Sequence, residues 1–171
     1  MNNERLHIPT VQFDFENPPM DPVKLYNELS DFMCENRGVG LAANQIGYPW
    51  SVFVMGNPNQ RDGVIAVFNP FLVDTFGEEV YIEEGCLSYP GLFLKIKRPA
   101  GVRVRFSGVT GETDTIKFEG FTARVFQHEY DHLLGLDFRK KATLYHYQKA
   151  MKDMKLLNRK RKRNDIISNS A

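Results

Sequence analysis

Residues 121–134 read Phe-Thr-Ala-Arg-Val-Phe-Gln-His-Glu-Tyr-Asp-His-Leu-Leu, and the rest of the chain is best understood outward from them. Apolar residues recur here at helical spacing and Gly135 follows as a stop signal, which predicts an α-helix. His128 and His132 are four residues apart, so both imidazoles face one side of that helix and can bind one divalent metal ion. Glu129 projects beside them and can take a proton from a water held by the metal. The alternative is a solvated charged helix face with two unrelated histidines.

A tetrahedral metal site needs one more protein ligand than these two histidines supply. Cys86 lies in the stretch EGCLS (84–88) and would complete a Cys-His-His site with one position open for water. The alternative for Cys86 is a small buried core residue, which is the usual role of a free cysteine. Downstream of the helix, His146 and Asp137 remain candidate ligands. Cys34, inside the first expected helix and without ligand-like neighbours, is assigned to the core.

A third segment of interest is GVGLAANQ (38–45). It lacks the Lys-Ser/Thr pair of a phosphate-binding loop and the full dinucleotide-binding spacing. Its glycines instead indicate that the backbone runs close to a ligand. Gln45 would then be a neutral amide donor, able to polarise a carbonyl group. The alternative for Gln45 is an ordinary surface glutamine.

The order of expected elements indicates an α+β domain. The 171 residues fit one domain, and 42% of them are apolar, enough to fill a core. Asp21-Pro22 predicts a helix start, and that helix ends by Gly38. Strands are expected over 51–55, 64–68, 95–97, 102–106 and 113–118, with a hairpin turn over 108–111. A last helix is expected over 144–157, with an apolar stripe of Leu144, Tyr147, Met151 and Met154.

Charge is divided unevenly along the chain although the formal total is only +1. Residues 1–138 carry 11 Lys/Arg against 19 Asp/Glu, and residues 139–171 carry 11 Lys/Arg against two Asp. The net charges are therefore −8 and +9, so an acidic body carries a basic tail. We expect a catalytic domain over 1–157 and a basic, flexible tail over 158–171.

Location is indicated by what the sequence lacks. No run approaches the ~20 apolar residues of a membrane helix, so no membrane partner is expected. The opening residues have no apolar signal core, and two cysteines are too few for a disulfide framework. These features predict a cytoplasmic protein.

The segments GVGLAANQ, EGCLS and QHEYDH, in this order and spacing, closely resemble the three signature motifs of the peptide deformylase family. The stretch PGLFLKIKRP (90–99) and the helix after the last motif are also similar, so the resemblance spans most of residues 20–157. Two departures stand out. The first twenty residues do not show the usual opening segment, and Phe93 occupies a position where some members carry a second arginine.

The resemblance implies a hydrolase that removes the formyl group from the N-terminal formyl-methionine of new polypeptides and releases formate. It also implies antiparallel β-sheets packed around a central metal-binding helix, with N-terminal and C-terminal helices. The roles it assigns are a divalent metal bound by Cys86, His128 and His132, acid/base catalysis by Glu129, and oxyanion stabilisation by Gln45 and the backbone N–H of Leu87.

The same resemblance suggests where the peptide binds. Substrate would pair as an added strand with backbone near Val39, Gly40 and Gly85. The methionine side chain would contact Phe121 and Val125, with Ile82 as a weaker candidate, although core packing is an equal alternative for each. Arg98 is either structural or near the mouth of the substrate site. Arg124 is expected to face elsewhere. Glu84 and Asp131 are candidate partners of the imidazoles, although a solvated carboxylate is the default interpretation of Asp131.

The sequence allows several metal ions and several partners. A Cys-His-His site accepts Fe²⁺, Zn²⁺, Ni²⁺ or Co²⁺, and the resemblance favours Fe²⁺ in the cell with zinc often substituting in purified protein. Formyl-methionyl nascent peptides are the expected partners, and the basic C-terminal helix and tail could contact the ribosome or only aid solubility. We expect a monomer. Rival functions are a zinc peptidase that cuts internal bonds and an RNA-binding module with a structural metal.

Overall fold

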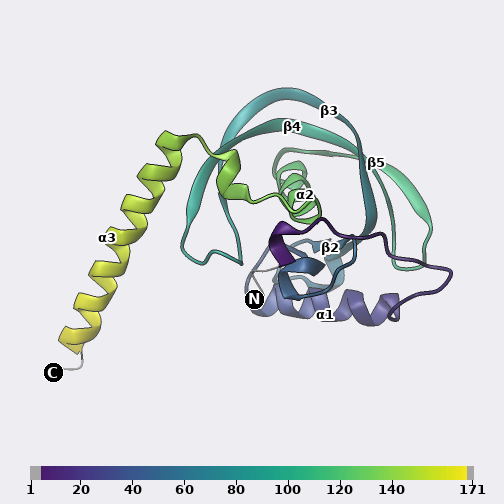
Figure 1. Ribbon diagram of the computed structural model, residues 1–171, viewed down its shortest axis with the longest axis horizontal. Helices are drawn as coiled ribbons and strands as arrows, with labels where there is room; N and C mark the ends of the chain where they lie inside the picture. Colours follow the sequence, from purple (N-terminus) through teal and green to yellow (C-terminus); the bar gives the residue numbers. More distant parts are fainter. Residues whose placement is uncertain (1–4, 169–171) are drawn as a thin grey trace.

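The computed structural model describes residues 5–168, which form helices and one antiparallel sheet (Figure 1). The helices are α1 (Pro22–Glu35), α2 (Gly120–Leu133) and α3 (Leu144–Ser168), with short 3-10 turns η1 (Arg5–His7), η2 (Ala43–Ile46), η3 (Arg61–Gly63) and η4 (Phe138–Lys141). The strands, hydrogen-bonded to one another in chain order, are β1 (Gly40–Ala42), β2 (Val52–Met55), β3 (Ile65–Gly85), β4 (Phe93–Ser107) and β5 (Thr113–Glu119). The predicted α+β class is confirmed, with the strands joined in a single sheet.

Helix α1 begins where its cap predicts. The Asp21 side chain accepts a hydrogen bond from the Lys24 backbone N–H at 2.9 Å, and Pro22 occupies the first turn, where its missing N–H costs nothing. One face of the helix is fully buried through Leu25, Leu29 and Met33. This face packs on β1 and β2, and so supports the segment that carries Gln45.

Strands β3 and β4 are much longer than the runs expected from the sequence. One expected strand ended at Phe68, directly before Asn69-Pro70, and proline cannot donate a hydrogen bond to a sheet ladder. The structure instead continues β3 through a register shift between Phe68 and Phe71, where Asn69 adopts a φ of +48°. Further shifts follow at Leu72/Asp74 and Phe76/Glu79. Such irregularities bend a sheet, and the long β3–β4 pair arches over α2 (Figure 1).

Helix α2 lies beneath this arch, with strand β2 on its other side (Figure 1). Phe126 is fully buried and packs against Phe53 of β2 and Phe118 of β5. The apolar core around it includes side chains of β3 and β4, namely Val67, Val102 and Val104. Apolar packing therefore holds α2 on several sides and leaves its histidine face directed at the end of β3.

Helix α3 projects from the rest of the molecule (Figure 1). Its first turns pack on β4 and η4 through Tyr147, Met151 and Met154, as the stripe predicts. Leu144, the fourth member of that stripe, is 71% exposed, so its assignment was wrong. The helix continues to Ser168, eleven residues beyond its expected end at Leu157. Within the described part of the chain, no helix has the length and apolar character needed to cross a membrane.

Candidate metal centre

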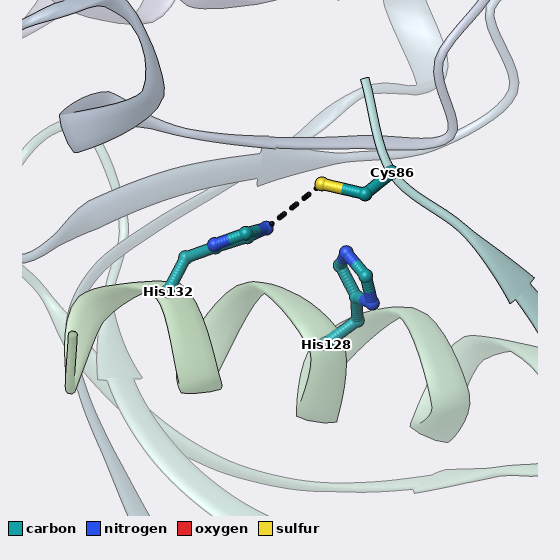
Figure 2. A group of neighbouring side chains, drawn as sticks. All are labelled: Cys86, His128 and His132. Carbon is teal, nitrogen blue, oxygen red and sulfur yellow. Dashed lines mark hydrogen bonds between the residues drawn. The ribbon is translucent and has the colours of Figure 1, made fainter. Parts of the chain in front are cut away.

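Cys86, His128 and His132 come together at one point (Figure 2). Both imidazoles rise from one face of α2, and Cys86 reaches them from just beyond the end of β3. The Cys86 Sγ lies 3.2 Å from His132 Nε2, and one ligand atom from each of the three residues lies within 4.8 Å of the others. Metal–ligand bonds of about 2.0–2.3 Å in a tetrahedron separate ligand atoms by about 3.5 Å. A thiol and two imidazoles at this spacing fit a divalent transition metal.

The ring of His128 is oriented by Glu84. The His128 Nδ1 donates a hydrogen bond to Glu84 Oε2 at 3.0 Å, which leaves Nε2 as the ring atom that could bind a metal ion. Although burial alone would raise the pKa of the Glu84 carboxyl, hydrogen bonds from His128 and Arg98 lower that pKa to about 2. Glu84 is therefore a buried carboxylate that fixes the tautomer and the direction of a metal ligand.

Two buried arginines hold Glu84 in place. Arg98 donates from Nε and Nη2 to the two oxygens of Glu84 at 2.7 and 3.0 Å. Arg124 donates to Glu84 Oε1 at 2.9 Å, and also to the carbonyl oxygens of Ile96 and Val80. The expectation that Arg124 faces elsewhere was wrong, because this side chain is 3% exposed and lines the cavity of the site.

Asp131 and Arg98 form a buried ion pair with each other. Asp131 does not contact either imidazole; its carboxylate pairs with Arg98 at 2.6 Å and with Lys141 at 3.1 Å. Arg98 is 4% exposed, and its donors are occupied by Glu84, Asp131 and the carbonyl oxygen of Gln127. Arg98 is absent from the described lining of the cavity, so the structure favours its structural alternative over a substrate contact.

Glu129 lies beside the ligands and is 4% exposed. Its Oε2 is buried and has no hydrogen-bond partner among the described residues. Burial raises the pKa of the Glu129 carboxyl to about 7, in the range in which a group can both accept and return a proton. A Cβ added at Gly40 would lie 2.5 Å from Glu129 Oε1, so the carboxylate occupies this position only because residue 40 is glycine.

The amide of Gln45 has a defined orientation. Its Oε1 accepts a hydrogen bond from the Ala42 backbone N–H at 2.8 Å. The Nε2 group therefore faces the other way, 3.0 Å from Ser88 Oγ and 3.7 Å from Cys86 Sγ. An amide N–H donor thus lies next to the metal ligands, as the proposed polarising role requires.

Neither of the downstream candidate ligands lies in the group of three. Asp137 pairs with Arg139 and accepts from the Tyr89 hydroxyl, and His146 packs against Tyr81. Asn44, which sequence reasoning passed over, donates from Nδ2 to the His132 carbonyl oxygen at 2.6 Å. Its place one residue before Gln45, in the same glycine-containing segment, was the available signal.

Cys86 and His128 border a cavity of about 530 Å³. His132 is buried and is not among the described residues that line this cavity. Burial, together with the neighbouring His128, lowers the pKa of the His132 imidazole to about 3, and the neutral ring is the form that binds a metal. Predicted site residues that line the cavity are Val39, Gly40, Gln45, Gly85, Leu87, Phe121, Val125 and Glu129. Ile82, the weaker candidate, is not among the described lining residues.

The chain matches a known protein family over most of its length. A family model for polypeptide deformylase matches residues 1–146. The chain belongs to the polypeptide deformylase family. The match starts at residue 1, so it includes the first twenty residues. In the described part of that segment, the Thr10 N–H donates to the carbonyl oxygen of Leu133, the last residue of α2, at 2.8 Å.

Several deformylases are similar over nearly the whole chain. A peptide deformylase of Aquifex aeolicus is 39% identical over 163 residues, covering 90% of this chain and 95% of that protein. A peptide deformylase structure from Legionella pneumophila has a TM-score of 0.80 at 30% identity and covers 95% of both chains. A Met-Ala-Ser-bound class I type b peptide deformylase from Acinetobacter baumannii has a TM-score of 0.74 at 28% identity, covering 82% of this chain and 94% of that one.

Family membership makes the chain a peptide deformylase-type enzyme, which removes the formyl group from nascent peptides and depends on a metal ion. The Cys-His-His group supplies a donor set that fits this dependence.

Proposed function

We propose that this chain hydrolyses the formyl amide of N-terminal formyl-methionine on new polypeptides, releasing formate, in the cytoplasm where such chains are made. One observation carries the proposal. A single cavity brings Cys86 and His128, backed by His132, next to a buried Glu129 oxygen that has no partner among the described residues. A ligand group beside an available acid/base is the arrangement that metal-assisted hydrolysis needs.

Cys86, His128 and His132 would hold one divalent ion. When bound, such an ion supplies a Lewis acid that lowers the pKa of water and polarises a carbonyl oxygen. We infer Fe²⁺ in the cell, with Zn²⁺, Ni²⁺ or Co²⁺ able to replace it in purified protein. Anaerobic purification with elemental analysis and activity per metal tests this, and we expect the iron form to predominate. A fresh anaerobic preparation that holds only zinc would contradict it.

Glu129 moves the proton in this proposal. Its buried Oε2 can accept a proton from the water that attacks the formyl carbon, so that the new C–O bond forms at that carbon. The carboxylic acid then returns the proton to the methionine nitrogen as the C–N bond breaks. The products are formate and a peptide with a free amino terminus.

Gln45 and Leu87 would stabilise the tetrahedral oxyanion. The hydrogen bond from Ala42 directs the Gln45 Nε2 toward Cys86, so the amide donor is in position before substrate arrives. Leu87 follows the ligand Cys86 directly and lines the same cavity, which supports the assignment of its backbone N–H.

The peptide would enter as an added strand between Val39–Gly40 on one side and Gly85 on the other, since all three line the cavity. The methionine side chain would then contact Phe121 and Val125 of α2. The formyl carbon carries only hydrogen besides its amide, so it can approach the narrow space beside Glu129. A bulkier acyl group would meet the same walls.

Formate release from formyl-Met-Ala-Ser, with and without chelator, tests this function; the peptide follows the ligand of the Acinetobacter baumannii structure. We expect turnover that a chelator abolishes and a divalent metal restores. The matched control is unblocked Met-Ala-Ser, which should remain intact. An inert formyl peptide together with cleavage of unblocked peptides would overturn the proposal in favour of a zinc peptidase.

We also propose that the basic C-terminal segment contacts ribosomal RNA. Residues 139–171 carry a net charge of +9, and α3 projects from the body (Figure 1). Phosphate contacts weaken as salt rises, because the release of counterions from the nucleic acid, which favours binding, gains less free energy at high salt. Deleting residues 158–171 should therefore weaken ribosome co-sedimentation at low salt more than at high salt. Co-sedimentation that is unchanged by the deletion would contradict ribosome contact.

A further inference from the structure

A second groove lies next to the catalytic cavity, between α3 and the end of the β3–β4 pair. Its volume is about 340 Å³. The apolar side chains that line it include Phe93 from β4 and Tyr145, Met154 and Leu157 from α3. We call these four residues and the space between them the α3 groove.

The α3 groove is continuous with the catalytic cavity. Glu83, Gly91 and Phe93 line both spaces. Phe93 pairs with Gly85 in the β3–β4 register, and a Cβ added at Gly85 would lie 2.8 Å from the Phe93 ring. Because Glu83, Gly91 and Phe93 line both spaces, the groove opens at the edge of the catalytic cavity.

The residues that line the α3 groove suit the binding of apolar side chains. Phe93 is 56% exposed, Tyr145 69% and Leu157 56%, although each is a large apolar or aromatic residue. Exposed apolar residues that gather around one groove mark a binding surface. The charged residues that line it are balanced in sign, two acidic and two basic: Glu83, Asp153, Lys95 and Lys149. The groove therefore offers apolar contact without selecting a charged ligand.

We propose that the α3 groove binds the nascent peptide beyond its third residue, and that it favours apolar side chains there. The inference rests on the proposed deformylase function, since it concerns the same substrate. Four further residues of extended peptide span about 13 Å and would start at the cavity edge, where the groove begins. Apolar side chains in this segment would pack against Phe93, Tyr145 and Leu157.

The other side of the cavity is assigned to the methionine side chain. A recess of about 330 Å³ there shares Val39, Phe121 and Val125 with the cavity and also includes Ile65. Phe121 and Val125 are the walls proposed above for methionine. With the side chain there, the backbone would leave past Gly91 and Phe93, which line the cavity but are not among the described lining residues of that recess.

Three peptides test this inference: formyl-Met-Ala-Ser, the same peptide extended by Gly-Leu-Phe-Gly, and the same peptide extended by Gly-Ser-Ser-Gly. For the wild-type protein we expect kcat/KM on the apolar heptapeptide to be about tenfold higher than on the polar one, from burial of two apolar side chains. The gain should lie in KM with kcat nearly unchanged, because the segment is remote from the reacting bond.

Variants of α3 then locate the contact. Tyr145→Ala and Leu157→Ala should each reduce the ratio between the two heptapeptides to about threefold or less, through loss of apolar contact. Leu144→Ala and Leu156→Ala are matched controls, because each is the neighbouring exposed residue of the same helix outside the described lining of the groove. Both controls should keep the wild-type ratio. Taking the ratio within one variant cancels any general loss of activity.

Each other outcome overturns the inference. Equal kcat/KM for the two heptapeptides in wild-type protein would exclude an apolar tail site. A ratio that survives both Tyr145→Ala and Leu157→Ala but falls in Ile65→Ala would place the tail in the opposite recess. If formyl-Met-Ala-Ser itself is not hydrolysed, the proposed function fails instead, so the two failures are distinguishable.

Discussion

Helix α2 lies inside the molecule while α3 projects from it (Figure 1). Apolar side chains are usually buried and charged ones exposed, and the two helices depart from this rule in opposite ways. In α2, charged or titratable groups are buried, among them His128, Glu129 and Asp131. In α3, large apolar groups are exposed, among them Tyr145 and Leu157. Buried polar residues indicate a reactive site, and a patch of exposed apolar residues indicates a binding surface. The two helices therefore indicate two different contributions, catalysis by α2 and substrate binding by α3.

The buried charges of α2 are tolerated because their partners come from other elements. Arg98 of β4 and Arg124 of α2 surround Glu84 of β3, and Arg98 also pairs with Asp131. A buried ion pair is stable only when its remaining donors and acceptors are satisfied. Within α2, Glu129 Oε2 and His132 Nδ1 lack partners among the described residues, and both residues belong to the candidate metal centre.

The largest expected effect is that of Glu129→Ala. It should lower kcat by about 10²–10⁴-fold, the usual contribution of a general acid/base, while the protein keeps its metal. Formate release and elemental analysis measure the two properties. Glu119→Ala, at the exposed N-terminal end of the same helix, is the control and should retain activity. Near-wild-type kcat in Glu129→Ala would show that another group moves the proton.

The second largest effect is expected for Glu84→Ala, because this substitution leaves Arg98 and Arg124 buried without the carboxylate that they share. We expect the free energy of unfolding to fall by about 3–5 kcal/mol and metal affinity to fall about 10–100-fold. Urea unfolding and competition with a chelator measure these changes. Glu79→Ala removes an exposed pair with Lys97 on the same two strands and should cost at most about 1 kcal/mol. Equal losses in the two variants would remove the distinction between buried and exposed pairs.

A smaller effect is expected for Gly40→Ala. The new Cβ would lie 2.5 Å from Glu129 Oε1, closer than van der Waals contact allows, so the carboxylate must shift. A misplaced catalytic group costs up to about 10²-fold in kcat, with metal content unchanged. Gly108→Ala is the control, because a Cβ there meets nothing within 4 Å. If Gly40→Ala kept full kcat, the present position of Glu129 would not be the productive one.

The smallest effect concerns α3. Met151→Ala removes a half-buried contact with β4 and η4, and should lower the free energy of unfolding by about 1 kcal/mol. Turnover of formyl-Met-Ala-Ser should stay within about twofold of wild type. Phe126→Ala, fully buried in α2, should cost about 3–5 kcal/mol in the same unfolding measurement. A larger loss for Met151→Ala than for Phe126→Ala would reverse the comparison of the two helices.

Much of the site could be predicted because its signals are local. His128 and His132 share a helix face by their spacing alone, and the cap Asp21 marked the start of α1 correctly. The long strands could not be predicted, since Asn69-Pro70 ends a strand by local rules and only pairing with β4 carries β3 through it. Arg124 was misplaced for a related reason. Its burial depends on Glu84 and two carbonyl oxygens from distant strands.

The sequence by itself determined the pair of imidazoles, the choice of Cys86 through its family motif, and the division between an acidic body and a basic end. These follow from spacing, residue type and charge, which need no knowledge of distant contacts. Only the tertiary structure decided that Arg98 and Arg124 both hold Glu84, that Gly40 admits Glu129, and that Phe93 joins the cavity to α3. Those relations depend on the register of β3 with β4 and on the position of α2 beneath them, and register is set by packing across the whole sheet.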